Sequence, residues 1–232
     1  MSQIFRQGLN WIIIDHISNL DFTDEVINSV SQKDYSDYTS AKGPKSKQHY
    51  IMNPSWMPMA NFEEPSGWPK LREKYTQIVQ REIVNYGLMP MNWRELHACS
   101  AWTVIGEEGS YHTIHEHGPM NISTVTYLKV PQQKRTLEDL QNLTPSTTPP
   151  VEATAGQIYF VMDGAPYNPL STPHYRLFHI TPQEGMIVIF PSWMLHGVYP
   201  QGPGIRQTLN IDFNGDPNYK FNLPHSGGAS FN

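Results

Sequence analysis

The sequence predicts a mainly β fold, a sandwich or barrel of short strands with a helical layer outside one sheet. From about residue 93 onward, short runs of β-forming residues alternate with turns at roughly even spacing. This spacing is typical of sandwiches and barrels rather than of alternating β-α-β units. Before that point, the clearest periodicity is helical. We therefore expect a helical and irregular layer over residues 1–92 that packs on a β core over residues 93–232.

The N-terminal layer is expected to hold two helices. The longer one begins near Pro69, a residue that suits the first turn of a helix, and ends at Gly87. Its apolar stripe recurs every three or four residues and comprises Leu71, Tyr75, Ile78, Val79, Ile83 and Tyr86. A shorter helix is predicted from about Thr23 to Ser31. Between the two, residues 34–69 are rich in Ser, Lys, Pro and Tyr and are expected to form an irregular connection.

Seven β runs are predicted: Leu96–Ile105, Ile114–His117, Ile122–Val130, Gln157–Met162, Tyr175–Ile180, Met186–Phe190 and Gln207–Phe213. Because Met186–Phe190 is apolar throughout, we expect it in the middle of a sheet with both faces covered. A loop insertion over residues 131–155 interrupts the core, and its second half cannot bury enough apolar surface to order itself. This loop is either a surface excursion, the preferred interpretation, or a lid over a site.

Composition excludes several classes of function. The 232-residue chain has a net charge of −5 and no basic block, which argues against nucleic acid as a partner. No apolar run approaches the roughly 20 residues of a membrane span, and residues 1–10 lack a signal-peptide pattern. One cysteine, Cys99, excludes a disulfide framework within the chain and fits a reducing compartment such as the cytoplasm. With ten histidines present, a metal site should be built from imidazole.

The candidate metal ligands lie in two separate segments. In an extended strand, alternate side chains share a face, so His115 and His117 project together while Glu116 points the opposite way. His196, beyond an apolar strand and a turn, could supply a third imidazole and leave positions open for other ligands. For the H-x-H pair alone, two unrelated polar histidines near a strand end are the alternative.

A polar strand face follows His196. Arg206 comes ten residues later, and we expect the two residues on consecutive strands of a hairpin. The returning strand places four polar side chains on one face: Arg206, Thr208, Asn210 and Asp212. Buried polar groups without partners are costly, and a guanidinium inside a barrel pairs best with a carboxylate. That carboxylate belongs either to a ligand or to an acidic side chain of the chain itself.

The order of these residues resembles that of the 2-oxoglutarate/Fe(II)-dependent oxygenases: H-x-H, a distant His, an Arg ten residues later, and a hydroxyl residue two beyond it. Phe190-Pro191-Ser192-Trp193 through His196, and residues 209–214, are similar to a prolyl-hydroxylase-like branch found among bacteria and phages. The resemblance covers about residues 93–214 and is most specific over 185–214. It implies a double-stranded β-helix, or jelly roll, working in the cytoplasm, which would be the host cytoplasm for a phage protein.

The resemblance also implies an activity and its cofactors. Fe(II), 2-oxoglutarate and O₂ would serve the oxidation, usually hydroxylation, of a peptidyl or small-molecule substrate that the sequence does not identify. His115 and His196 would bind iron, Arg206 would bind the C5 carboxylate of 2-oxoglutarate, and Thr208 would support that carboxylate. Two further candidates for the co-substrate are Tyr127 and Asn121, which could instead be a core aromatic and a turn residue. Beyond the metal ligands, no catalytic residue is predicted.

Position 117 departs from the family pattern, which usually has a carboxylate as its second metal ligand. We expect a three-histidine site of His115, His117 and His196, although a carboxylate could come from a bulge or from Glu107 or Glu108. Three neutral ligands would also suit a cupin-type metalloenzyme that does not use 2-oxoglutarate. A non-catalytic jelly-roll binding module is the remaining alternative. Arg206 and Thr208 favour the 2-oxoglutarate enzyme, because cupins do not require them.

Overall fold

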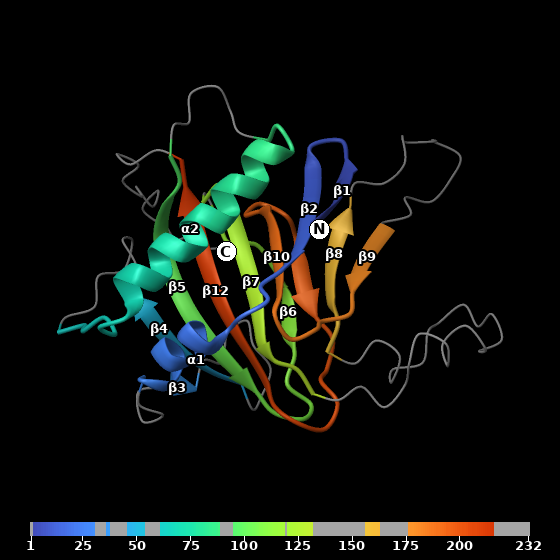
Figure 1. The fold of residues 1–232 in the computed structure, drawn as a ribbon. Coiled ribbons are helices and arrows are strands. Elements are labelled where there is room, and N and C mark those ends of the chain that lie inside the picture. Colours follow the sequence, from blue (N-terminus) through green and yellow to red (C-terminus); the bar gives the residue numbers. More distant parts are fainter. Residues whose placement is uncertain are drawn as a thin grey trace, which may run out of the picture.

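The computed structural model describes residues 2–30, 36–37, 46–53, 61–88, 95–118, 120–131, 156–162 and 176–215. Over these residues, two antiparallel β-sheets face each other, and two helices lie outside the larger sheet (Figure 1). This arrangement is a double-stranded β-helix, so the mainly β fold class predicted from the sequence is confirmed. No helix in the described part of the chain is both long and apolar enough to span a membrane.

The secondary structure elements have the following bounds. The helices are α1 (Asp21–Asn28) and α2 (Trp68–Asn85). The strands of the eight-stranded sheet are, in spatial order, β1 (Gln3–Gln7), β2 (Asn10–His16), β10 (Met186–Pro191), β7 (Ile122–Lys129), β12 (Arg206–Asn214), β5 (His97–Gly106), β4 (Ser46–Met52) and β3 (Ser36–Asp37). Those of the four-stranded sheet are β6 (His112–His115), β11 (His196–Val198), β8 (Ile158–Met162) and β9 (Arg176–Ile180).

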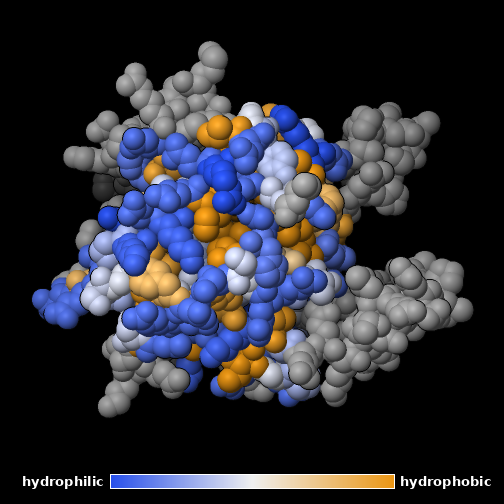
Figure 2. Space-filling model, viewed as in Figure 1, coloured by the Kyte–Doolittle hydropathy of each residue, from blue (hydrophilic) through white to orange (hydrophobic). Residues whose placement is uncertain are grey.

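The helices cover the outer face of the large sheet, as the sequence predicts. Pro69 lies in the first turn of α2, where its missing N–H costs no hydrogen bond. The buried stripe of α2 packs with α1 and the sheet into one core and comprises Trp68, Leu71, Tyr75, Val79 and Ile83. Figure 2, viewed from the same side as Figure 1, shows hydrophilic residues across much of this face. The helical layer therefore shields the sheet on the side away from the small sheet.

Strand β10 lies in the centre of the large sheet, paired with β2 on one side and β7 on the other. All six of its residues are buried. Ile187 and Ile189 belong to the core beneath the helices, whereas Val188 and Phe190 belong to the core between the two sheets. Alternate side chains of a strand point to opposite faces, so a strand covered on both sides must be apolar throughout. The prediction for Met186–Phe190 is confirmed.

The N-terminal layer contains strands as well as helices, which the sequence analysis did not predict. β2 pairs with β10, and β4 pairs with β5, so both extend the large sheet. Residues 46–52 therefore form a strand where an irregular connection was expected, and that expectation is wrong. These strands are specified by partners far along the chain, whose backbone groups they satisfy, rather than by their own alternation. The division of the chain at residue 93 stays a prediction, and residues 132–155 of the expected loop insertion lie outside the described residues.

The predicted hairpin between His196 and Arg206 is wrong. β11 pairs with β6 and β8 in the small sheet, whereas β12 pairs with β5 and β7 in the large sheet. The chain therefore changes sheets between residues 198 and 206. As a result, His196 and Arg206 approach the interior from opposite sheets.

The central position of β10 can be tested by the variant Ile189→Ala. Ile189 is fully buried, and removing a buried aliphatic side chain leaves a cavity, so we expect a loss of about 2–5 kcal/mol in the free energy of unfolding. Ile205→Ala is the matched control, because Ile205 is 53% exposed and its loss should change stability by no more than about 0.5 kcal/mol. Urea denaturation measures both values. Equal losses in the two variants would contradict the arrangement.

Candidate active site

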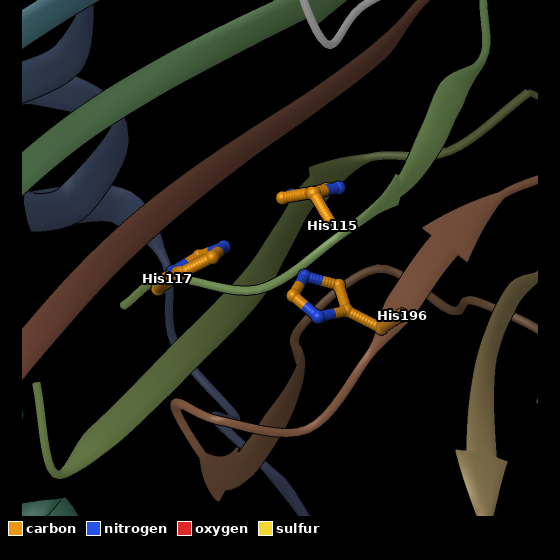
Figure 3. A group of neighbouring side chains, drawn as sticks. All are labelled: His115, His117 and His196. Atoms are coloured by element: carbon orange, nitrogen blue, oxygen red, sulfur yellow. The ribbon is translucent and has the colours of Figure 1, made fainter. Parts of the chain in front are cut away.

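Three histidine rings converge on one point between the two sheets (Figure 3). His115 ends β6 and His196 begins β11, and the two residues are directly opposite each other in the antiparallel pairing. One nitrogen from each of His115, His117 and His196 lies within 4.8 Å of the others. The ring centroids are 4.4 Å apart for His115 and His196, 4.9 Å for His117 and His196, and 5.4 Å for His115 and His117. The structure thus brings together the three predicted metal ligands.

His117 reaches this point from outside the strand. β6 ends at His115, two residues earlier than the predicted strand, and the N–H of His117 donates instead to the carbonyl oxygen of Ser192 at 3.0 Å. Gly118 follows with a φ of +71°, a conformation that a glycine adopts without strain and that turns the chain at this position. His115 and His117 therefore lie next to each other, as expected from the alternation of side chains in a strand, although His117 lies in the turn after the strand.

Hydrogen bonds from Nδ1 fix the orientation of His115 and His196. His115 Nδ1 donates to the carbonyl oxygen of Thr113 at 2.7 Å, and His196 Nδ1 donates to that of Met194 at 2.9 Å. A carbonyl oxygen only accepts, so Nδ1 carries the proton in both rings. A neutral ring of this tautomer keeps its lone pair on Nε2, the form in which histidine binds a metal.

The third ring is held by a carboxylate. His117 Nδ1 lies 2.8 Å from Oδ1 of Asp212, which also accepts a hydrogen bond from the Ser123 hydroxyl at 2.7 Å. Ser123 Oγ lies 3.0 Å from His117 Nδ1 and 2.8 Å from Ser192 Oγ. Asp212 was expected on the polar face of its strand, but the sequence offers no sign of its partner. The sequence carries no signal for Ser123 or Ser192, because a serine in a strand or in the turn after it predicts no particular contact.

Burial keeps the His196 ring neutral. The side chain is 3% exposed, and this burial lowers the pKa of His196 well below its usual value, with His117 and His115 lowering it further. The hydrogen bond to the Met194 carbonyl acts in the opposite direction but is the smaller effect. Desolvation disfavours the charged imidazolium, so the ring is in the neutral form that can donate a lone pair.

The three rings line a cavity of about 340 Å³. Arg206, Thr208, Asn210 and Asp212 of β12 line it from the large sheet, as their shared strand face predicts. Small-molecule sites typically have volumes of about 300–1,000 Å³ and combine apolar walls with a few polar groups. The cavity therefore has the size and lining of a ligand site.

Arg206 brings an unpartnered cation into this cavity. The residue is 2% exposed, and neither of its terminal nitrogens has a hydrogen-bond partner in the part of the chain that the structure describes. The buried hydroxyl of Tyr127, which also lines the cavity, has no described partner either. Burial lowers the pKa of Arg206, and its interaction with Tyr127 raises it; burial raises the pKa of Tyr127 to about 12. Among the described residues, the alternative of a salt bridge to an acidic side chain is therefore not found.

Of the other two predicted co-substrate residues, one lines the cavity and one does not. Thr208 lines the cavity, and its hydroxyl accepts a hydrogen bond from the Asn210 amide at 3.2 Å. Asn121 is not brought to the cavity: its side-chain oxygen accepts a hydrogen bond from the N–H of Gly215 at 2.9 Å. This contact joins two chain segments and agrees with the alternative, in which Asn121 is a turn residue.

The structure also places the carboxylates considered as ligands. Glu107 and Glu108 are exposed and do not line the cavity. Glu116 lines its mouth but is exposed and is not part of the three-residue group of potential metal ligands. In the described part of the chain, that group contains histidines alone.

Some cavity residues were beyond the reach of sequence reasoning. Gln48 and Tyr50 come from β4, which lies in the stretch expected to be irregular, so no strand parity could have placed them. Trp102 of β5 also lines the cavity, and its ring centroid lies 5.4 Å from that of His117. Trp193, which follows Ser192 in the motif of the resemblance, is 49% exposed and does not line the cavity.

Comparisons with known proteins agree with this geometry. Residues 100–214 match the model of a family described as 2OG-Fe(II) oxygenase. No curated protein sequence matches the chain. The 115 residues that match the family model run from β5 to the end of β12 and include all three histidines and Arg206.

Several solved structures share the fold. A prolyl-4-hydroxylase from Pseudomonas putida is similar at 14% identity and a TM-score of 0.56, with 88% of this chain and 92% of that chain covered. A Trichoplax adhaerens prolyl hydroxylase in complex with a peptide fragment is similar at 12% identity and a TM-score of 0.54, covering 88% and 83%. HygX from Streptomyces hygroscopicus, with nickel and 2-oxoglutarate bound, is similar at 10% identity and a TM-score of 0.56, covering 90% and 84%. At such identities the likeness concerns the fold.

Proposed function

We propose that this chain, which belongs to the 2-oxoglutarate/Fe(II)-dependent oxygenase family, is a hydroxylating dioxygenase that couples oxidative decarboxylation of 2-oxoglutarate to substrate oxidation. Fe(II), 2-oxoglutarate and O₂ are the cofactor set of this family. One observation carries the proposal: the three-histidine cluster lines the same cavity as Arg206, whose two terminal nitrogens have no hydrogen-bond partner among the described residues. A metal that keeps open positions and a cation that binds a carboxylate are together what a chelating oxo-acid requires.

His115, His117 and His196 are the proposed ligands of Fe(II). Each ring is held through Nδ1 by an oxygen atom of the protein, which leaves Nε2 available for the metal. Three imidazoles bring no negative charge, so the metal keeps its full positive charge. Such a centre favours an anionic co-substrate.

Arg206 is the proposed partner of the distal carboxylate of 2-oxoglutarate. Its two terminal nitrogens suit a bidentate carboxylate, and a buried guanidinium gains most from a charged acceptor. The hydroxyl of Tyr127, whose pKa of about 12 keeps it protonated, and the hydroxyl of Thr208 would donate further hydrogen bonds. Asn121 has no part in this proposal, because its side chain is engaged elsewhere.

Bound together, Fe(II), 2-oxoglutarate and O₂ supply the oxidising chemistry, with succinate and CO₂ formed from the co-substrate. The protein positions these groups and keeps water out. Apolar cavity walls from both sheets serve the second task and include Trp102, Val125, Ile158 and Val198. The substrate is proposed to be a peptide or a small molecule, as fold and cofactor together do not select one substrate.

An anaerobic titration with Fe(II) followed by 2-oxoglutarate tests the proposal. We expect one Fe(II) per chain and a visible charge-transfer band that grows to saturation with one equivalent of 2-oxoglutarate. Stoichiometric iron without any 2-oxoglutarate effect would favour the cupin-type metalloenzyme. Absence of stoichiometric metal would favour the non-catalytic binding module.

A further inference from the structure

The hydrogen bond of His117 differs in kind from those of the other two histidines. His115 and His196 each donate to a backbone carbonyl two residues earlier in the chain, which is a neutral acceptor. His117 donates to the Asp212 carboxylate, 95 residues away, at 2.8 Å. The Nδ1 hydrogen bond of His117 thus links its ring to a full negative charge, whereas those of His115 and His196 go to neutral carbonyl groups.

Asp212 is held in place for this contact. Its side chain is 3% exposed and that of His117 is 9% exposed, so water screens their interaction little. The Ser123 hydroxyl donates to the same Oδ1 at 2.7 Å, and Ser192 in turn contacts Ser123. A buried carboxylate without partners is strongly disfavoured, and no lysine or arginine pairs with Asp212 among the described residues. The imidazole and the hydroxyl are the groups that compensate its burial.

We propose that Asp212 is a positioning residue of the metal centre that acts through His117. This inference rests on the proposed function, because it takes His117 to be a metal ligand. The carboxylate fixes the proton of His117 on Nδ1, directs Nε2 toward the metal, and makes the ring a stronger electron donor. It also places one negative charge next to a centre whose three protein ligands are neutral.

The test compares the Co(II) affinity of Asp212→Asn with that of the wild type. The asparagine side chain is nearly isosteric and can still accept a hydrogen bond, but it carries no charge. We expect a Co(II) dissociation constant about 10–100 times higher than that of the wild type, together with a changed d–d absorption spectrum. The apoprotein should show no matching loss in the free energy of unfolding, which urea denaturation measures.

Glu82→Gln is the matched control. Glu82 is also a buried carboxylate, 2% exposed, but it lies on α2 and pairs with Arg81 at 2.7 Å. This variant should leave the Co(II) dissociation constant unchanged, whatever its effect on stability. A second variant, Ser123→Ala, keeps the charge of Asp212 but removes the hydroxyl that holds it, and we expect a smaller loss of affinity than in Asp212→Asn.

The outcomes separate this inference from the proposed function. If the wild type binds Co(II) tightly and Asp212→Asn and Ser123→Ala both have the same Co(II) dissociation constant as the wild type, the role of Asp212 is refuted while the metal site stands. The same follows if affinity falls only in proportion to lost stability, or falls equally in Glu82→Gln. If the wild type itself binds no stoichiometric Co(II), the proposed function fails and the role of Asp212 fails with it.

Discussion

The variant His196→Ala is expected to bind Fe(II) about 100-fold or more weakly than the wild type and to form no succinate. Loss of a group that merely orients a metal ligand costs about 10–100-fold in affinity, so loss of a ligand itself should cost at least as much. His196 is the most buried of the three rings. Among the described residues, the group of potential metal ligands contains the three histidines alone, so no fourth residue of that group could replace His196. Metal titration and succinate assays measure the two effects.

The control for this variant is His16→Ala, because His16 is an exposed histidine on β2, outside the cavity. It should bind Fe(II) and form succinate as the wild type does. His115→Ala provides a second ligand variant at a less buried position, in case removal of the His196 ring destabilises the core between the sheets. Turnover like that of the wild type in either ligand variant would exclude the proposed ligand set.

Arg206→Met should abolish the response to 2-oxoglutarate while leaving metal binding intact. Arg206 lines the cavity and its two terminal nitrogens have no described hydrogen-bond partner, so the co-substrate carboxylate is its expected counter-ion. In the wild type loaded with metal, 2-oxoglutarate at about 100 times its dissociation constant should raise the free energy of unfolding by about 2.7 kcal/mol. In Arg206→Met this increase should be absent. Thermal unfolding with and without 2-oxoglutarate, under anaerobic conditions, measures the difference.

For the apoprotein without 2-oxoglutarate, we expect that Arg206→Met does not lower the free energy of unfolding. A buried cation without a partner is costly, so a methionine of similar length should leave the apoprotein as stable as the wild type or more stable. Arg206→Lys is the matched control, since it keeps the charge but not the two-nitrogen geometry, and it should retain part of the response to 2-oxoglutarate. An undiminished response in Arg206→Met would show that Arg206 does not bind the co-substrate.

Local pattern predicted much of the fold, because burial imposes a period on each element. The stripe of α2 recurs with the helical period since one face of the helix covers the sheet. β10 is apolar throughout since both its faces are covered. β4 carries no such pattern: its buried and exposed residues do not alternate regularly, and its partner β5 lies about 50 residues away. Its existence as a strand depends on that partner.

The site shows the same division. The spacing of His115 and His117 and the polar face that starts at Arg206, taken together with the family resemblance, predicted residues that line the cavity. Asn121 could not be decided from the sequence, because a turn amide suits a ligand and a backbone N–H equally well, and the structure pairs it with Gly215. The contact of Asp212 with His117 joins residues 95 positions apart. The alternation of side chains in a strand predicts the face on which Asp212 lies but not its partner.

The residue pattern and the family resemblance that it carries predicted which side chains gather at the site: imidazoles at three positions, and a polar strand face beginning with a guanidinium. The polar face follows from periodicity, since a side chain's direction within a strand depends on its immediate neighbours in the chain. The three imidazoles do not, because His117 lies in the turn after β6 and His196 lies on another strand. The folded structure was needed to show that His196 and Arg206 come from opposite sheets, and that Asp212 hydrogen-bonds to His117. Sheet membership and such contacts depend on pairing between distant strands, whose register is set by the whole folded core.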